Sequence, residues 1–332
     1  MSIAFFIPHK GCRHRCSFCD QRAVSGQGEP VTAAEVSAAL ERAFLHPQPP
    51  GTEIAFFGGS FTCLPRTEMA AFLEAAYPFV AAGKAAGIRC STRPDGIDGE
   101  VLAILKHYQV RAVELGAQSM DDRVLALNGR GHTAAGVIQA AALIHSAGLE
   151  LGVQMMVGLP GEQEGGAART AERLIALKPA TVRIYPALTL KGTRMAELFL
   201  AGQYQPLTLE EAVRQCAALM EIFKKAGVKV IRVGLQAERS LEENLLAGPY
   251  HPAFRELCEG AAIQEAVDKA LAGFPEGAAL TLWVHPKDRS RTAGHQKQNL
   301  RHWAGMGYAV AIREDRAAVP GSWRLEQQAA SP

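Results

Sequence analysis

Residues 11–19 read GCRHRCSFC, and the three cysteines in this stretch say more about the protein than any other part of its 332 residues. Cys12, Cys16 and Cys19 follow a short apolar run and form a C-x3-C-x2-C pattern. The chain has 7 cysteines, and random placement would produce this spacing about 0.003 times per chain. The spacing therefore indicates that the three thiols hold a metal.

Two kinds of metal site suit three clustered thiols. Thiolates bind soft or borderline metals, so zinc and an iron–sulfur cluster are the candidates. His9 or His14 could complete a Cys3His zinc site. A closed zinc site usually holds a small domain together, whereas this loop lies beside a large domain that needs no such support. A 4Fe–4S cluster with three protein ligands would leave one iron open to a bidentate amine and carboxylate.

Composition places the chain among ordinary globular proteins. It is 48% hydrophobic and 20% charged, and its net charge of +2 neither requires nor excludes a polyanionic partner. The apolar run from Ile3 to Ile7 is too short for a signal peptide or a membrane span, so we expect a cytoplasmic protein without membrane contact. Four further cysteines are expected to be small buried side chains: Cys63, Cys90, Cys216 and Cys258.

Short apolar runs alternate with helix-like stretches along residues 1–235, which we assign to one domain. Such βα units predict a parallel sheet with right-handed crossovers, here an α/β fold of the partial (β/α)6-type TIM barrel class. The distinctive motifs all follow predicted strands, at the edge where a curled parallel sheet gathers its functional residues. The predicted strands are 3–8, 53–57, 88–92, 110–115, 149–157, 181–186 and 228–233.

The cysteine spacing, with Phe18 before the last cysteine, resembles the signature of the radical S-adenosylmethionine (SAM) superfamily. In that family three cysteines hold a 4Fe–4S cluster, and the methionine part of SAM binds the open iron. An electron from an external donor then cleaves SAM, and the 5′-deoxyadenosyl radical takes hydrogen from the substrate. The resemblance implies that the cluster ligands are Cys12, Cys16 and Cys19.

Other motifs extend the resemblance over residues 1–235. Gly58, Gly59 and Ser60 resemble the segment that contacts the amino group of SAM, although a glycine pair could simply end a strand. ELGAQSMDDRVLALNGRGHT, residues 114–133, is more specific. Its polar residues could also be ordinary hydrogen-bonding groups. The resemblance implies that SAM is contacted by Gln118, Arg130, Gln154, Tyr185 and, through its backbone, Phe18.

Within the superfamily, GGSFTCLP, TRPD, GLPG and YPALTLKGT most resemble the radical domain of the Elongator catalytic subunit, which modifies the wobble uridine of tRNA. The gap between the first two cysteines is shorter here. The region after residue 235 is too short for the acetyltransferase domain of that subunit, so we do not expect acetyl-CoA as a partner. The oxygen-independent coproporphyrinogen III oxidase shares the short cysteine spacing and suggests a different substrate class.

The βα pattern weakens after residue 235, and we assign residues 236–332 to a small C-terminal α/β module. A helix over 253–271 and a strand over 279–284 are predicted in it. Trp283 and Trp303 flank a basic segment that predicts a phosphate-binding surface for RNA with a stacking face, unless the segment is only a solvated loop. The basic residues expected to contact RNA are Lys287, Arg289, Arg291 and Lys297.

These observations predict a radical SAM enzyme that modifies a tRNA-like RNA. A radical SAM enzyme acting on a tetrapyrrole or a nucleotide is an alternative, as is a non-enzymatic, metal-holding RNA-binding protein. Nothing in the sequence assigns the residues that contact the substrate.

Overall fold

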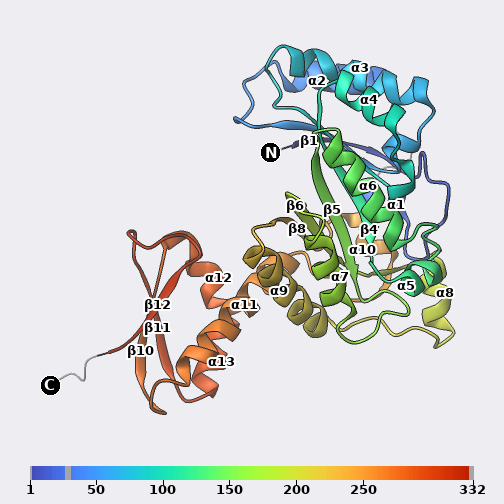
Figure 1. Cartoon of the computed structure of the whole chain (residues 1–332). Coiled ribbons are helices and arrows are strands. Elements are labelled where there is room, and N and C mark those ends of the chain that lie inside the picture. Colours follow the sequence, from blue (N-terminus) through green and yellow to red (C-terminus); the bar gives the residue numbers. More distant parts are fainter. Residues whose placement is uncertain (1, 27–30, 329–332) are drawn as a thin grey trace. The chain divides into compact units, whose positions relative to one another are not determined.

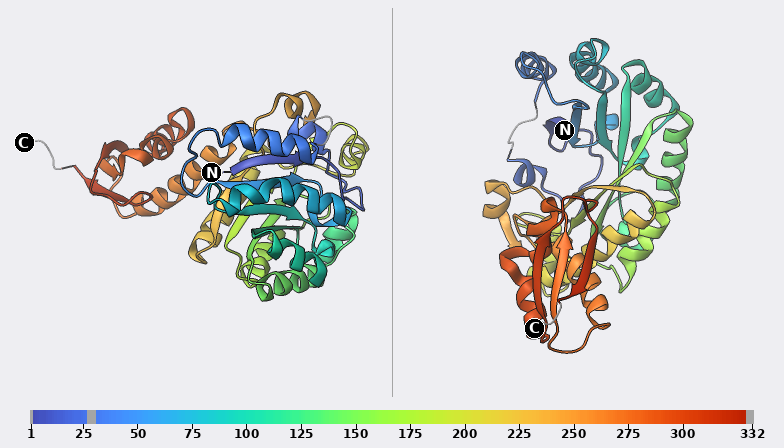
Figure 2. Two further views of the ribbon diagram at one scale, coloured as in Figure 1. Left: turned by 90° about the horizontal axis from the view of Figure 1, so that it is seen from above. Right: turned by 90° about the vertical axis from the view of Figure 1, so that its left-hand side faces the viewer.

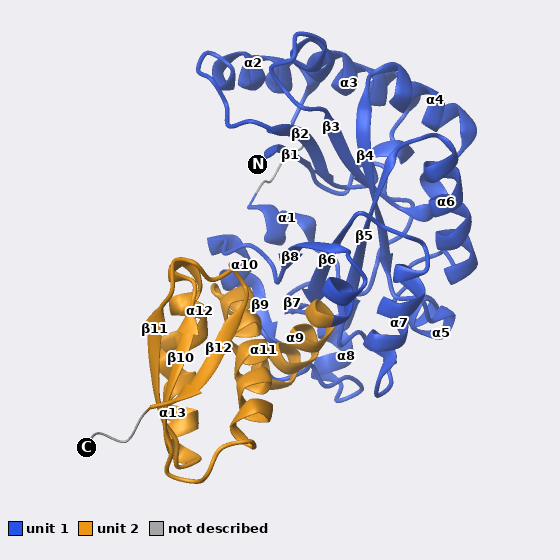
Figure 3. Cartoon of the chain, turned by 60° about the vertical axis from the view of Figure 1, so that its left-hand side comes forward, with its two compact units in different colours: residues 1–208, 222–250 blue, residues 209–221, 251–332 orange. Residues whose placement is uncertain are grey.

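The computed structural model describes residues 2–26 and 31–328. The chain forms two compact units, residues 1–208 with 222–250, and residues 209–221 with 251–332 (Figure 3). Residues 236–250, which the sequence analysis assigns to the C-terminal module, lie in the first of these units.

A seven-stranded parallel sheet forms the centre of the first unit, and the strands lie in it in sequence order. Figure 1 shows the sheet curled, with helices along its outer side. The predicted partial barrel is therefore confirmed, and the last strand extends it beyond six βα units. The strands are β1 (Ser2–Ile7), β2 (Glu53–Gly58), β3 (Ile88–Thr92), β4 (Val110–Gln118), β5 (Glu150–Val157), β6 (Thr181–Pro186) and β8 (Lys229–Val233).

Helices between the strands cover the outer face of the sheet. Helix α2 (Ala33–Ala43) begins with a capping box, in which Thr32 Oγ1 accepts from the Glu35 amide and the Glu35 carboxylate accepts from the Thr32 amide. Leu40, Leu73 and Leu105 belong to three of these helices and are fully buried. The helices are α2 (Ala33–Ala43), α3 (Arg66–Ala81), α4 (Gly99–His107), α6 (Ala134–Ser146) and α7 (Gly166–Ile175), with short helices α1 (Gln21–Ser25), α5 (Asp122–Leu127) and α8 (Arg194–Leu200) in the loops.

The two faces of the sheet differ in chemistry because side chains alternate along each strand. On β5, Leu151 and Val153 are buried on the helix-covered face. The inner face carries polar side chains, with Gln154 in register with Arg183 of β6. Candidate chemical groups therefore gather on the inner face and at the carboxyl ends of the strands.

Residues 236–250 are fixed to the first unit by α10 (Arg239–Asn244) and β9 (Leu245–Ala247). Ser240 Oγ donates to the carbonyl of Ala23 at 2.8 Å. Leu241 is fully buried beside Ala23, and β9 pairs with the short strand β7 (Thr189–Leu190). This segment closes over α1, which explains why it does not follow the C-terminal unit.

The second unit contains α9 (Leu209–Lys225) as far as Glu221 and a small α/β structure from residue 251 onward, whereas the sequence analysis expected the C-terminal α/β module to begin at residue 236. Its sheet has the order β11-β10-β12, parallel between β10 and β11 and antiparallel between β10 and β12 (Figure 2). Trp303, Leu280 and Leu282 are fully buried in its core. The elements are α11 (Phe254–Leu271), β10 (Ala279–Val284), α12 (Arg289–Ala293), α13 (Gln298–Gly305), β11 (Ala309–Glu314) and β12 (Trp323–Gln327).

Among the helices of the described ranges, none is long and apolar enough to cross a lipid bilayer.

Candidate active site

The three cysteines lie in the loop between β1 and α1, at the carboxyl edge of the sheet. Gln21, in the first turn of α1, ties this loop to the end of β2. Its Nε2 donates to the carbonyl of Gly58 at 2.6 Å, and its Oε1 accepts from the amide of His9 at 2.5 Å. The backbone amide of Gln21 donates to Nε2 of His9 at 3.0 Å, so this ring nitrogen already has a partner. Nothing in the sequence singles out Gln21 as a residue of this site.

Glycines allow the cysteine loop and the loop after β2 to touch backbone to backbone. The amide of Ser60 donates to the carbonyl of Lys10 at 2.9 Å. A Cβ atom on Gly59 would lie 2.0 Å from that carbonyl oxygen, and one on Gly11 would lie 2.2 Å from the carbonyl oxygen of Ser60. Glycine is therefore required at both positions by the contact between the loops, and the contact brings Ser60 Oγ to 3.9 Å from Cys12 Sγ.

A second contact comes from residues 128–131, the NGRG of the longer motif. Asn128 is fully buried, and its Oδ1 and its carbonyl accept from the hydroxyl and the amide of Ser17 at 2.5 and 3.0 Å. Gly131 has a φ of +67°, and a Cβ atom there would lie 2.4 Å from Nε2 of His14. The motif thus fits against the cysteine loop, and Asn128 is a site residue that sequence reasoning missed.

Arg130 brings a positive charge directly to the cysteine loop. Its Nη1 donates to Cys16 Sγ at 3.1 Å, and its Nη2 donates to the carbonyl of Gly116 at 2.5 Å. Arg93 donates to the carbonyl of Arg130 and pairs with Asp95 at 2.9 Å. Arg130 Nε and Arg93 Nη1 are buried donors that have no hydrogen-bond partner in the described structure. Unpaired buried donors suit an anionic ligand, because leaving them unpaired costs free energy.

Gln118, the last residue of β4, lies beside Gln154, which is within β5. Gln154 Nε2 donates to Gln118 Oε1 at 3.2 Å, and the strand register shifts between Gly116 and Gln118. Gln118 is buried and has a φ of +66°, a left-handed conformation that is uncommon for residues other than glycine. Such backbone strain concentrates at functional sites and persists where neighbouring structure fixes it. A Cβ atom on Gly116 would lie 2.9 Å from Gln118 Nε2, so the glycine makes room for this amide.

Phe18 and Tyr185 form an apolar wall beside the cysteine loop. Both are partly buried and pack on the same cluster, which includes Met156 and Met195. The amide of Met195 also donates to the carbonyl of Ser17 at 2.8 Å, which ties the loop to α8. The structure thus brings together the cysteine loop, its glycine partner and the polar and aromatic residues that the sequence analysis singled out.

The inner face of the sheet carries a network of buried charges. Arg183 binds Glu114 through two nitrogens, at 2.5 and 3.1 Å. Arg89 reaches the same carboxylate at 3.5 Å and also binds Glu53 and Glu150. The side chains of Glu114 and Arg89 are only 4% and 9% exposed. Since each charge has partners of opposite sign, the network fixes the sheet surface below the cysteine loop.

The surroundings of the cysteine loop change the acidity of its thiols. Burial, followed by the nearby charges of Cys16 and Cys12, raises the pKa of Cys19 to about 12. A bound metal offsets this effect and displaces the protons. No three His, Cys, Asp or Glu side chains of the described residues converge on one metal ion. A cubane cluster binds each cysteine at a different iron and does not require such convergence.

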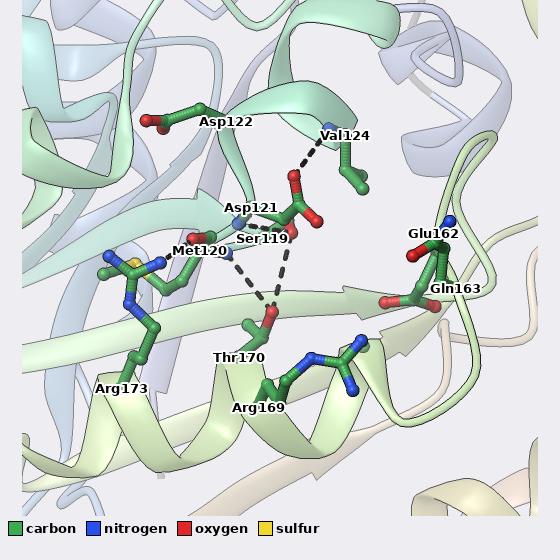
Figure 4. A pocket seen from close by; sticks show the side chains of 11 residues that line it. Ser119, Met120, Asp121, Asp122, Val124, Glu162, Gln163, Arg169, Thr170 and Arg173 are labelled. Atoms are coloured by element: carbon green, nitrogen blue, oxygen red, sulfur yellow. Dashed lines mark hydrogen bonds between the residues drawn. The ribbon is translucent and has the colours of Figure 1, made fainter.

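A separate pocket of about 240 Å³ lies between the loop after β4 and helix α7 (Figure 4). Figure 4 shows Arg169 and Glu162 on its rim and Thr170 beneath the backbone of Met120. Burial raises the pKa of Glu162 to about 7, although its carboxylate accepts from the amide of Gly158 at 2.5 Å. None of the predicted cofactor contacts lines this pocket.

The basic segment of the second unit differs in part from its prediction. Trp303 is fully buried and donates from Nε1 to Asp268 at 2.8 Å, so the expectation that it offers a stacking face is wrong. Arg289 pairs with Glu314 at 3.3 Å, and Arg291 pairs with Glu259 and Asp288 at 3.5 and 3.3 Å. Lys287 and Lys297 are exposed. Two of the four predicted basic residues therefore already pair with acidic neighbours in this structure.

Comparison with known families agrees with this geometry. The model of the radical SAM superfamily matches residues 6–174, about half of the chain. The chain belongs to the radical SAM superfamily. Enzymes of this superfamily use a 4Fe–4S cluster and SAM. A second model, of the radical SAM C-terminal domain, matches residues 179–263.

Individual relatives place the chain near the Elongator radical enzymes. It is 28% identical over 214 residues to the uncharacterized protein MJ0486 of Methanocaldococcus jannaschii, covering 59% of this chain and 64% of that protein. It is 33% identical over 138 residues to the tRNA uridine(34) acetyltransferase of the same organism, covering 40% of this chain and 25% of that protein. The chain thus spans less than two thirds of the length of these relatives.

Solved structures confirm the fold of this radical SAM protein. The archaeal Elp3 of Methanocaldococcus infernus superposes with a TM-score of 0.65 at 21% identity, over 80% of this chain and 63% of that one. Coproporphyrinogen III oxidase of Escherichia coli superposes with a TM-score of 0.51 at 16% identity, over 68% and 52% of the two chains. At these identities the likeness concerns the fold alone.

Proposed function

We propose that this radical SAM enzyme acts on RNA. We also propose that its active site lies where the cysteine loop meets the loop after β2 and residues 128–131. The observation that carries the site assignment is the guanidinium of Arg130, 3.1 Å from Cys16 Sγ. It comes from a motif more than a hundred residues away and holds a positive charge against the thiol. In this proposal Cys12, Cys16 and Cys19 each bind one iron of the 4Fe–4S cluster.

The bound cluster and SAM would supply the electron and the 5′-deoxyadenosyl group for radical chemistry, and the surrounding residues would orient SAM. Arg130 and Arg93 offer buried N–H donors for anionic groups. Gln118 and Gln154 present a fixed pair of amides for the polar parts of the cofactor. The segment Gly58, Gly59 and Ser60, whose Ser60 Oγ lies 3.9 Å from Cys12 Sγ, is proposed to meet the amino group.

The apolar wall has a complementary role in this proposal. Phe18 and Tyr185 pack on one cluster with Met156, and would shield the adenine from water. The charged network of Glu114 and Arg183 lies on the same inner face as Gln154. It would keep this surface rigid while the substrate approaches the cofactor.

Sequence similarity to a tRNA-modifying protein supports RNA as the substrate. The relative that is 33% identical over 138 residues is named for its action on uridine 34 of tRNA. The matched stretch is a minority of that relative, so the product of the reaction is a separate question. The electron would come from an external donor.

The test is anaerobic reconstitution followed by reduction in the presence of SAM. The enzyme should turn brown and release 5′-deoxyadenosine. Cys16→Ala should lose the iron–sulfur absorbance, whereas Cys258→Ala, at a buried position in the second unit, should keep it. A protein that binds iron but never cleaves SAM would contradict the enzymatic proposal.

The RNA part needs its own readout. Transfer RNA incubated with the reduced enzyme should yield an altered nucleoside by mass spectrometry, and the Cys16→Ala variant should not produce it. Unchanged RNA combined with steady 5′-deoxyadenosine release would favour a small-molecule substrate.

A further inference from the structure

The sheet of the second unit has two different faces. Leu280, Leu282 and Val284 of β10 are buried in the core of this unit, where α11 and α13 cover the sheet (Figure 1). Thr281 and Trp283 alternate with them and therefore point to the opposite face. Within the second unit, no described helix covers that opposite face (Figure 3).

An aromatic side chain on this face is flanked by two arginines. The strand register places Arg313 of β11 and Arg324 of β12 directly beside Trp283 of β10. Both arginines are exposed, and Trp283 is partly exposed. We call these three residues the Trp283 row. The row shares Trp283 with the RNA-binding surface predicted from sequence, but neither of its arginines belongs to the basic segment of that prediction.

The indole of Trp283 is held in a fixed orientation. Its Nε1 donates to Glu326 Oε2 at 2.8 Å, and the guanidinium of Arg324 lies 5.8 Å from the ring centroid. Arg324 also binds the other oxygen of Glu326 at 2.5 Å. Arg313 has no ion pair or hydrogen-bonding side-chain partner within the described residues, so its charge is available. A ring that is already oriented loses little entropy when a ligand stacks on it.

We propose that the Trp283 row binds an unpaired segment of RNA, with a base stacked on Trp283 and phosphates paired with Arg313 and Arg324. This proposal rests on the proposed action on RNA. An aromatic ring on an open sheet face, flanked by cations, is the chemistry that recognises unstacked bases and their backbone. A duplex keeps its bases stacked and would leave the ring unused. An apolar protein partner is disfavoured, because the cross-strand neighbours of Trp283 are both charged.

The experiment measures RNA binding by the whole chain with a fluorescein-labelled, single-stranded 12-mer and with the blunt duplex of the same sequence. The single strand should bind more tightly. Trp283→Ala should weaken single-strand binding about 10-fold, the range for loss of one stacked base. Trp283→Phe should recover part of the affinity, because it restores a ring. Arg313→Gln combined with Arg324→Gln should weaken binding and make it less dependent on salt, because phosphate contacts are lost.

Arg301→Glu is the matched control. Arg301 is exposed on α13, which covers the other face of the sheet, and its replacement should change the affinity less than 2-fold. Circular dichroism checks that each variant is folded. If Arg301→Glu weakens binding as much as the row variants do, binding is only electrostatic and the proposal is overturned.

Two further outcomes separate this proposal from the proposed function. If the enzyme alters transfer RNA but Trp283→Ala and the double arginine variant bind the 12-mer like the wild type, the Trp283 row fails alone. If the wild type neither binds nor alters RNA, both proposals fail. Release of 5′-deoxyadenosine without RNA should be the same in the wild type and all row variants, because the row is not part of the cofactor site.

Discussion

Glu114→Gln should destabilise the protein strongly, because it removes the negative charge that two buried arginines share. The carboxylate is 4% exposed, and Arg183, bound to it at 2.5 Å, is 17% exposed. Arg89 keeps Glu53 and Glu150 after the change, whereas Arg183 loses the one carboxylate that binds it in the described structure. Breaking a buried pair by removing one partner costs about 3 to 5 kcal/mol, since the remaining charge stays desolvated.

The control has a similar contact distance but no burial. Arg239 and Glu243 pair at 2.8 Å with side chains that are 92% and 59% exposed. Glu243→Gln should cost less than about 0.5 kcal/mol, because water solvates both groups.

Anaerobic urea denaturation, followed by circular dichroism, measures both variants. Adding Arg183→Met to Glu114→Gln should recover part of the loss, because it removes the unpaired guanidinium. A loss below about 1 kcal/mol for Glu114→Gln would refute the argument that this pairing compensates two buried charges.

Two further predictions concern the loops of the first unit. Gly59→Ala should sharply lower the iron bound after reconstitution, because its Cβ atom would lie 2.0 Å from the carbonyl of Lys10, whereas Gly99→Ala meets no atom within 4 Å and should bind normal iron. Equal iron contents would contradict the packing argument. Glu162→Gln should stabilise the protein at pH 8 by about 1 to 2 kcal/mol. This is less than the full pKa shift of Glu162 would give, because the side chain is partly exposed and water screens its charge. The raised pKa, about 7 against 4.5, means that the folded state favours the protonated acid, so wild-type stability present below pH 4.5 is lost as the pH rises through 7. Thermal unfolding from pH 4 to 8 tests this, and a constant difference between wild type and variant would rule it out.

The barrel could be predicted from sequence because its strands are apolar runs in regular alternation with helices. All seven strands of the sheet appear at their predicted places, as do β10 and α11. The strands β11 and β12 were not predicted, since they flank β10 and have mixed, partly exposed side chains. Residues 236–250 read as a break in the pattern, and their return to the first unit shows only in the structure, through the contact of Ser240 with Ala23 and the pairing of β9 with β7.

The role of the cysteine loop and of the motif at 114–133 in cofactor binding stays a prediction, but both stretches were singled out in the sequence, the first by the spacing of its thiols and the second by its resemblance to the radical SAM family. Gln21 and Asn128 were not, since an amide that joins two loops leaves no pattern in the sequence around it. The burial of Trp303, by contrast, could have been predicted from the sequence. Leu300, three residues earlier, faces the same core, and this helical spacing predicts a buried stripe.

The way in which the loops interlock bears on the order of events during synthesis. The cysteines are made before Asn128 and Arg130, which hold Ser17 and Cys16 and emerge more than a hundred residues later. A nascent chain shorter than this has three thiols on a loop without its final supports. If these thiols hold the proposed cluster, its insertion into a defined site would wait for the 114 residues that separate Arg130 from Cys16, an interval in which the thiols are open to oxidation.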